Sequence, residues 1–197
     1  MSLQQHDLRA GFADLVREYQ ETGDTARLFA RMESLVTGAP AEQLAEAVEP
    51  WRGVPEIAGP VYERIVSERP HDARALVVLA NAYWLSGRGP DVVAELASRA
   101  ISADPSNRGA WHLWALAESN PRARTERWRQ VCARFPADDL AKANYADNAA
   151  SLASAESDPV AMKLAIAAYE DLLARATHPE QQNALEGALM TLRTWRP

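Results

Sequence analysis

Cysteine and long apolar runs are almost absent from this sequence. Cys132 is the single cysteine among 197 residues, which excludes an intramolecular disulfide and any zinc cluster built on several cysteines. No window approaches the roughly 18 uncharged apolar residues of a membrane span. The first residues, MSLQQHDLRAGFADL, show no basic stretch followed by an apolar core, so we expect no export signal. These absences favour a cytoplasmic protein.

β-Branched residues are also scarce. The chain has 38 alanines and 20 leucines, but only 12 valines, 7 threonines and 4 isoleucines. Strong helix formers therefore outnumber the residues that favour strands, and a mainly β fold is nearly excluded. Of the 21 basic residues 19 are arginine, which together with the alanine excess is typical of a GC-rich bacterial genome.

What the chain does contain is helical periodicity from end to end. Apolar residues recur at the spacing of an amphipathic helix, as in the series Leu8, Phe12, Leu15, Val16 and Tyr19. Six prolines stand at the start of such stretches, where proline disturbs a helix least: Pro40, Pro55, Pro90, Pro121, Pro159 and Pro179. We therefore expect an all-α chain of about eleven helices. Because the connections are short, neighbouring helices should pack antiparallel.

Three predicted helices end in similar residue patterns, each closed by a proline. Pro70 and Pro105 are 35 residues apart, and Pro136 follows 31 residues later. An aromatic or small residue precedes each proline by eight positions, and a small or aliphatic residue precedes it by five. These pairs are Tyr62 and Ile65, Ala97 and Ala100, and Trp128 and Val131. A period of this length indicates a repeat of helix pairs.

The spacing resembles that of the tetratricopeptide repeat, a helix-turn-helix unit of about 34 residues. The best match follows the family's order of large, small, aromatic, glycine and proline positions: Leu76, Leu79, Ala80, Tyr83, Gly87, Val93, Ala97, Ala100 and Pro105. It departs from the family by one extra residue in the turn between Ser86 and Asp91, and by Ala97 where an aromatic residue is usual. The resemblance is good over residues 55–136 and weak elsewhere. It implies a right-handed superhelix of antiparallel helix pairs.

This match suggests a division of the chain into two parts. Residues 1–54 form an N-terminal helical extension or cap, and residues 55–197 form the repeat domain, which ends in a capping helix over residues 179–195. No Gly/Ser-rich linker separates them, so we expect one continuous structure. Within it, small residues such as Ala80 and Ala100 should let neighbouring helices approach closely, while Trp111, Trp114 and Trp128 fill the spaces between helix pairs.

The sequence carries little that suggests catalysis, a metal or a cofactor. The four histidines lie far apart, without metal-ligand partners on the same helix face: His6, His71, His112 and His178. The Gly87-Arg88-Gly89 turn lacks the spacing and the preceding strand of a phosphate-binding loop. Cys132 lies on the same side of its helix as Trp128 and Phe135, which favours a small packing residue over a nucleophile. We expect a non-enzymatic protein without a metal or cofactor.

The charge is unevenly spread along the chain. The net charge of −6 divides into −5 for residues 1–70, +3 for residues 71–136 and −4 for residues 137–197. Much of the basic part is a run of arginines interleaved with Trp128: Arg122, Arg124, Arg127 and Arg129. Such a run can follow phosphates, but it falls on the second helix of a repeat, which the resemblance places on the outer face, and the whole chain is acidic. Nucleic acid is therefore the weaker hypothesis. Pairing of these arginines with nearby acids, or contact with an acidic partner, is the stronger one.

One tryptophan stands outside the packing pattern. Trp84 directly follows the packing residue Tyr83, at a position that the resemblance assigns to the inner face of the first helix. It ends a stripe at helical spacing: Arg74, Val77, Asn81 and Trp84. The corresponding stripe one repeat later is His112, Leu116 and Ser119. Either the N-terminal helices fold over these stripes, or they form a groove for a peptide or helix, with Trp84 as an apolar anchor.

Some members of the family hold a terminal carboxylate with lysine, asparagine and arginine side chains from successive first helices. Asn81 and Arg74 are available here, but His112 and Leu116 stand where further donors would be needed, so that clamp does not transfer. The leading hypothesis is a scaffold, adaptor or chaperone-like module that binds a protein segment of unknown identity on the concave face. The alternatives are a homo-oligomer assembled through the acidic ends and the basic centre, or a nucleic-acid-associated regulator.

Overall fold

The computed structural model describes residues 3–196, with side chains from residue 7 onward, and every regular element within that range is helical. Eleven α-helices and one short 3-10 helix follow one another along these residues. They are α1 (Leu3–Thr22), α2 (Thr25–Thr37), α3 (Ala41–Val48), η1 (Glu49–Trp51), α4 (Pro55–Glu68), α5 (Ala73–Leu85), α6 (Pro90–Ala103), α7 (Arg108–Leu116), α8 (Pro121–Arg134), α9 (Asp139–Glu156), α10 (Pro159–Arg175) and α11 (Pro179–Arg193). The all-α prediction and the predicted number of helices are confirmed.

The helix starts follow the prolines. Pro55, Pro90, Pro121, Pro159 and Pro179 each occupy the first helical position, where the missing N–H removes no internal hydrogen bond. Pro40 stands one residue before α3. Several helices, including two of those that start with proline, begin after a side chain that accepts a hydrogen bond from a backbone N–H of the first turn. These caps are Asp24, Asp72, Asn120, Asp138 and Asp158.

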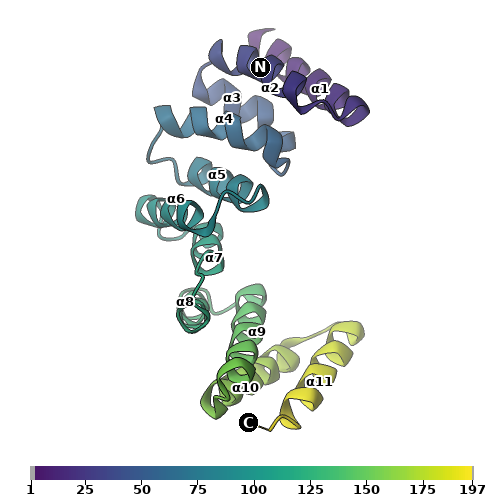
Figure 1. The fold of residues 1–197 in the computed structure, drawn as a ribbon, viewed down its shortest axis with the longest axis vertical. Helices are drawn as coiled ribbons and strands as arrows, with labels where there is room; N and C mark the ends of the chain where they lie inside the picture. The colour runs from purple at the N-terminus through teal and green to yellow at the C-terminus, as the bar shows by residue number, and fades with distance from the viewer. Residues whose placement is uncertain (1–2, 197) are drawn as a thin grey trace. The chain divides into compact units, whose positions relative to one another are not determined.

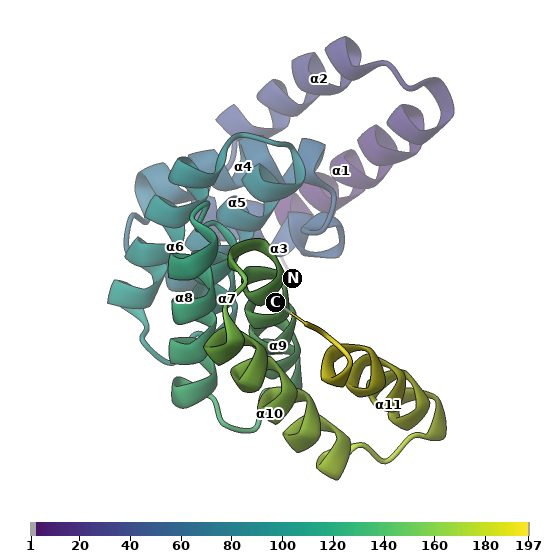
Figure 2. The same ribbon diagram turned by 60° about the horizontal axis from the view of Figure 1, so that its bottom comes forward.

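The chain forms two compact units, residues 1–113 and residues 114–197. The boundary that the sequence predicts between residues 54 and 55 lies inside the first unit and stays a prediction; Pro197, the end of the predicted repeat domain, lies outside the described residues. In the first unit each helix packs against the next along the series α3, α4, α5 and α6, and α1 packs against both α2 and α3. Figure 2 shows α1 and α2 as an antiparallel pair joined by a short turn.

Small residues let the helices of the first unit approach closely. Ala58, Ala80, Ala97 and Ala100 are completely buried, among larger buried residues that include Ile57, Val61, Ile65, Leu76 and Val93. Close backbone approach at alanine lets the larger side chains of neighbouring helices interdigitate, which is how a repeat built from helix pairs is packed. The packing role predicted for Ala80 and Ala100 is confirmed.

The extra residue in the turn between α5 and α6 is accommodated by two glycines. Gly87 has φ +70° and Gly89 has φ +102°, and both values lie in a region that side chains with a Cβ rarely adopt. Gly23, between α1 and α2, has φ +67° and ends α1 in the same way.

In the second unit α9 packs against both α8 and α10, and α11 packs against α10. Trp128, Val131, Ala149 and Ala165 are buried in its core. On α11 only Leu189 is fully buried, while Leu192 packs beside a small cluster formed by α9 and α10 residues. The last helix is thus thinly buried, and its capping role stays a prediction.

Asp138 offers a direct test of the caps. Its side chain is only 6% exposed and accepts a hydrogen bond from the backbone N–H of Ala141 at 3.1 Å. We expect Asp138→Ala to lower the free energy of unfolding of the second unit by about 1–2 kcal/mol, because the first turn of α9 loses its cap. Chemical denaturation followed by circular dichroism measures this change. The control is Asp139→Ala: Asp139 is exposed and forms an ion pair with Arg175, so its loss should cost under about 1 kcal/mol. Equal effects of the two substitutions would contradict the assignment.

Candidate functional site

The four residues of the first predicted stripe lie along one face of α5, since they are separated by three, four and three positions. Trp84 is 38% exposed and Arg74 is exposed, while Val77 and Asn81 are half-buried. A fully buried Trp84 would have excluded a binding role. The face instead presents an indole, an amide and a guanidinium to solvent.

The N-terminal helices contact one end of this stripe. The Arg74 guanidinium forms an ion pair with Glu49 of η1 at 2.7 Å, although its side chain remains 67% exposed. At the middle of the stripe Val77 lies against α7, because a Cβ at Gly109 would come within 3.3 Å of its Cγ1. Val77 is therefore partly a packing residue. Within the described part of the chain, the Asn81 side chain makes no hydrogen bond.

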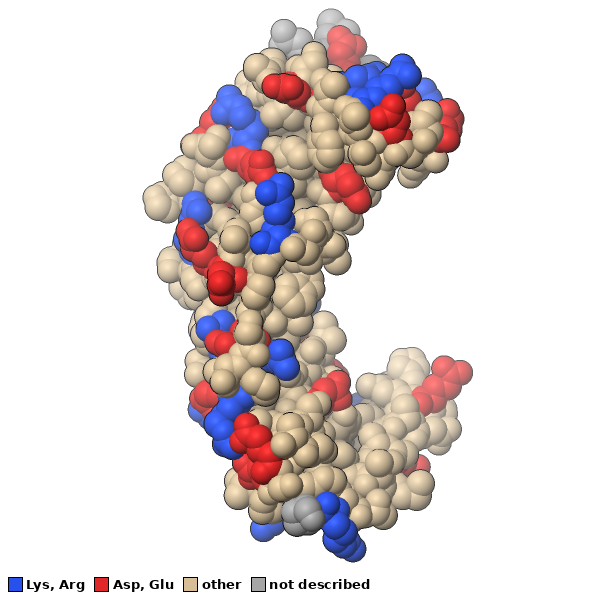
Figure 3. All heavy atoms as spheres, viewed as in Figure 1, with Lys and Arg blue, Asp and Glu red and all other residues tan. Residues whose placement is uncertain are grey.

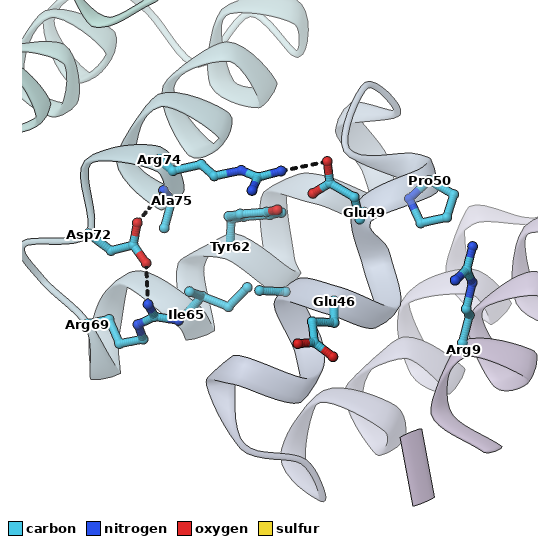
Figure 4. Close-up of a pocket in the computed structure, with 11 residues that line it drawn as sticks. Arg9, Glu46, Glu49, Pro50, Tyr62, Ile65, Arg69, Asp72, Arg74 and Ala75 are labelled. Atoms are coloured by element: carbon cyan, nitrogen blue, oxygen red, sulfur yellow. Dashed lines mark hydrogen bonds and ion pairs between the residues drawn. The ribbon is translucent and has the colours of Figure 1, made fainter. Parts of the chain in front are cut away.

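A cavity of about 460 Å³ adjoins the Arg74 end of the stripe. Its walls come from five elements of the first unit, α1, α3, η1, α4 and α5 (Figure 4). The polar lining residues are Arg9, Glu46, Glu49, Tyr62, Arg69, Asp72 and Arg74. Of these residues, the sequence patterns predict a binding role only for Arg74, and they place Tyr62 at a packing position of the repeat.

Tyr62 is the most buried polar residue of this cavity, at 2% exposure. Figure 4 shows its ring extending from α4 toward the middle of the group, with Arg69 and Asp72 on one side and Arg9 on the other. Burial raises the pKa of its phenol above the ordinary 10.0, and the carboxylate of Glu49 raises it further. The hydroxyl therefore stays protonated at neutral pH, so it can donate a hydrogen bond.

The second predicted stripe is divided between the two units. His112 lies on α7 in the first unit and is half-buried, whereas Leu116, also half-buried, and Ser119, which is exposed, belong to the second unit. A role for these three residues in binding stays a prediction.

The arginine run lies on α8, and each of its arginines has a partner within the second unit. Arg122 pairs with Glu156 and with Asp158, the latter at 3.3 Å. Arg124 donates to the Asn148 side chain at 2.7 Å. Arg127 pairs with Glu118 at 2.7 Å and lies over the Trp114 ring, 4.5 Å from its centroid. Arg129 donates two hydrogen bonds to Glu126, at 2.6 and 2.7 Å.

Three of the four guanidiniums are therefore paired with carboxylates, and Arg124 donates to a neutral amide. Blue and red side chains also lie close together on the face drawn in Figure 3. Binding to nucleic acid ordinarily depends on salt, because it releases counterions from phosphates. Since the arginines of α8 already have partners within the chain, we expect no salt-dependent shift with duplex DNA or single-stranded RNA in a gel assay. A shift abolished by Arg122→Ala and Arg129→Ala would overturn this expectation.

Other candidate chemistry is sparse in the described part of the chain. No group of three or more His, Cys, Asp or Glu side chains that could hold a metal ion occurs among the described residues. Cys132 is half-buried, and burial raises the pKa of its thiol, which disfavours the reactive thiolate. Among the described helices, none combines the length and the apolar composition that crossing a membrane requires.

The architecture resembles that of several solved proteins. Pseudomonas aeruginosa pilF superposes with a TM-score of 0.62 at 13% identity, over 96% of this chain and 86% of that one. MamA gives a TM-score of 0.59 at 15% identity, over 88% of this chain and all 100% of that one. TTC0263, a thermophilic TPR protein of Thermus thermophilus, gives 0.56 at 15% identity, over 98% and 100%.

The chain matches no protein-family model and no curated protein sequence. At such low identities the structural likeness shows the fold, and the resemblance to the tetratricopeptide repeat is confirmed at that level.

Proposed function

We propose that the chain is a non-enzymatic protein-interaction module that binds a peptide or helix on the α5 face of the first unit. The observation that carries the proposal is the exposed Trp84 indole on the same face as an Asn81 amide that has no hydrogen-bond partner within the described chain. Tryptophan is enriched among the residues that dominate binding energy at protein interfaces. An amide beside it can pair with the backbone of a bound segment.

The packing of α5 supports this proposal. Leu76, Leu79 and Ala80 hold the opposite side of α5 in the core, so the exposed face needs little ordering when a ligand binds. The step from a repeat fold to a binding module is an analogy between folds, and the Trp84 face gives it residues that can be tested.

Selection of random linear peptides displayed on phage tests the proposal. The immobilised full chain should select peptides with a large apolar residue, and Trp84→Ala should lose them. Leu85→Ala is the matched control, because Leu85 is 55% exposed and adjacent in sequence but lies off the stripe. Peptides that bind both variants as well as the original chain would refute the proposed site.

A further inference from the structure

A groove of about 660 Å³ runs between α10 and α11 in the second unit. These two helices are joined by a short turn (Figure 2). The apolar side chains of the groove are Leu173, Ala174, Leu189 and Met190. Met190 is 69% exposed, more than any other large apolar side chain among the described residues. This surface lies outside the proposed peptide-binding face of the first unit, so its role is a separate question.

α10 repeats a segment of α4. Residues 62–67 read YERIVS, and residues 169–174 read YEDLLA. The second, fifth and sixth positions of each segment line a surface groove. On α4 these residues are Glu63, Val66 and Ser67, and on α10 they are Glu170, Leu173 and Ala174. The two grooves therefore occupy equivalent positions in the repeat.

A further helix borders the α4 groove. Val92, Leu96 and Arg99 of α6 belong to its lining, and Val66 is only 7% exposed there. The lining of the α10 groove comes from α10, α11 and the adjoining Thr194, and Leu173 is half-buried. No other helix of the described residues lines the α10 groove, so the place that α6 takes in the first unit is open in the second.

α6 shows which kind of element fits such a groove. It follows α5 after a turn formed by residues 86–89, and helices joined by so short a turn pack antiparallel. Its buried face combines larger and small apolar residues, namely Val93, Leu96, Ala97 and Ala100. By this comparison the α10–α11 groove fits an amphipathic helix that runs antiparallel to α11.

The charges of the groove are complementary to α11 itself. Glu186 and Arg193 are seven residues apart, which places both on one face of α11, and both line the groove. Midway between them stand Leu189 and Met190. A second α11, antiparallel and centred on these two residues, brings each Glu186 opposite the Arg193 of the other copy. The sequence thus carries an apolar centre flanked by opposite charges at matching distances.

Both charged groups can take part in such a contact. The Glu186 carboxylate has no ion-pair partner within the described residues. Arg193 pairs with Glu170 at 2.7 Å through one nitrogen, and both side chains of that pair are at least half exposed. A guanidinium has five N–H donors, so it can bind a second carboxylate without losing the first.

We propose that the groove accepts α11 of a second copy of this chain, and that two copies associate about a two-fold axis. The same surface of each copy then serves as groove and as ligand, as a two-fold contact requires. Met190 of each copy enters the apolar part of the other groove, where its flexible side chain can adapt to the available space. A helix of another protein would have to supply both the apolar centre and the basic residue, whereas a second α11 has both at the required spacing.

Sedimentation equilibrium of the full chain across the micromolar range tests the proposal. The mass should rise with concentration toward about twice the 21.7 kDa of one chain. Met190→Glu places a carboxylate in the apolar centre and should keep the chain monomeric at the same concentrations. Leu140→Glu is the matched control, because Leu140 is 62% exposed on α9 and does not line the groove, so this variant should dimerise as the original chain does. Circular dichroism should show both variants folded, since both side chains are exposed in a single copy.

Two charge reversals test the antiparallel arrangement. Glu186→Arg and Arg193→Glu should each weaken the dimer about tenfold, because the two-fold axis replaces two opposite-charge contacts by two like-charge contacts. An equimolar mixture of the two variants should regain most of the original affinity. In the mixed dimer both positions again face a charge of opposite sign, and no contact within one chain can produce this recovery.

The outcomes are distinct. Dimerisation that is lost in Met190→Glu, and that mixing of the two reversed variants restores, supports the proposal. A chain that is monomeric at every concentration overturns it and leaves the groove to a different helix. An association that survives Met190→Glu, or that mixing does not restore, uses another surface or another geometry and also overturns it. Peptide binding at Trp84 is measured separately, so failure here leaves the proposed function standing.

Discussion

Replacing Trp128 with alanine is expected to lower the free energy of unfolding of the second unit by about 3–5 kcal/mol. Trp128 is 2% exposed and lies on α8, the helix that packs against α9. The substitution removes a large buried aromatic surface and leaves a cavity that the neighbouring helices fill only in part. In a repeat fold each interface supports its neighbours, so the loss should reach beyond α8.

Chemical denaturation of the full chain measures this effect. Phe135→Ala provides the control: Phe135 ends the same helix but is only half-buried, so its truncation should cost clearly less. A Trp128→Ala chain as stable as the Phe135→Ala chain would contradict the assignment of Trp128 to the core.

Replacing Trp84 with alanine is expected to produce the largest change in binding. At an interface centre, truncating tryptophan costs about 2 kcal/mol or more, which is a fall in affinity of about 30-fold or greater. The thermal midpoint should remain nearly unchanged, because Trp84 is 38% exposed and its loss creates no core cavity.

Anisotropy with a selected peptide and thermal unfolding by circular dichroism measure the two quantities on the same protein. Leu85→Ala should leave both nearly unchanged, because that side chain is exposed away from the stripe. A large fall in the thermal midpoint of Trp84→Ala would indicate a structural residue and would contradict the proposed role.

The helices were predictable because their signals are local. Proline at a first helical position and an aspartate or asparagine cap act on backbone groups within one turn, so the sequence alone reveals them. The alanines at helix contacts were predictable for a related reason, since the repeat places Ala80 and Ala100 at positions of close approach.

Burial of the tryptophans was predicted less well. Trp128 is in the core as expected, but Trp111 and Trp114 are only half-buried. Polar contacts account for the difference. The Trp111 indole N–H donates to the carbonyl oxygen of Pro105 at 3.0 Å, and Arg127 covers the Trp114 ring. Periodicity identifies a packing side of a helix but not whether a polar neighbour holds a ring near the surface.

The cavity beside α5 could not have been predicted from spacing. Arg9, Glu49 and Tyr62 come from elements outside the best-matched repeat, and tertiary packing alone brings them to Arg74. The partners of the arginine run were hidden for the same reason, as Arg122 finds Glu156 from another helix. Pairing with nearby acids was one of the alternatives that the sequence left open, but packing determines which acids these arginines meet.

Hydrogen–deuterium exchange with and without a selected peptide locates the bound segment on the chain. A peptide bound along α5 should slow exchange over residues 73–85 and leave exchange over residues 179–193 of α11 unchanged. Protection confined to the second unit, with α5 unaffected by a bound peptide, would contradict this prediction.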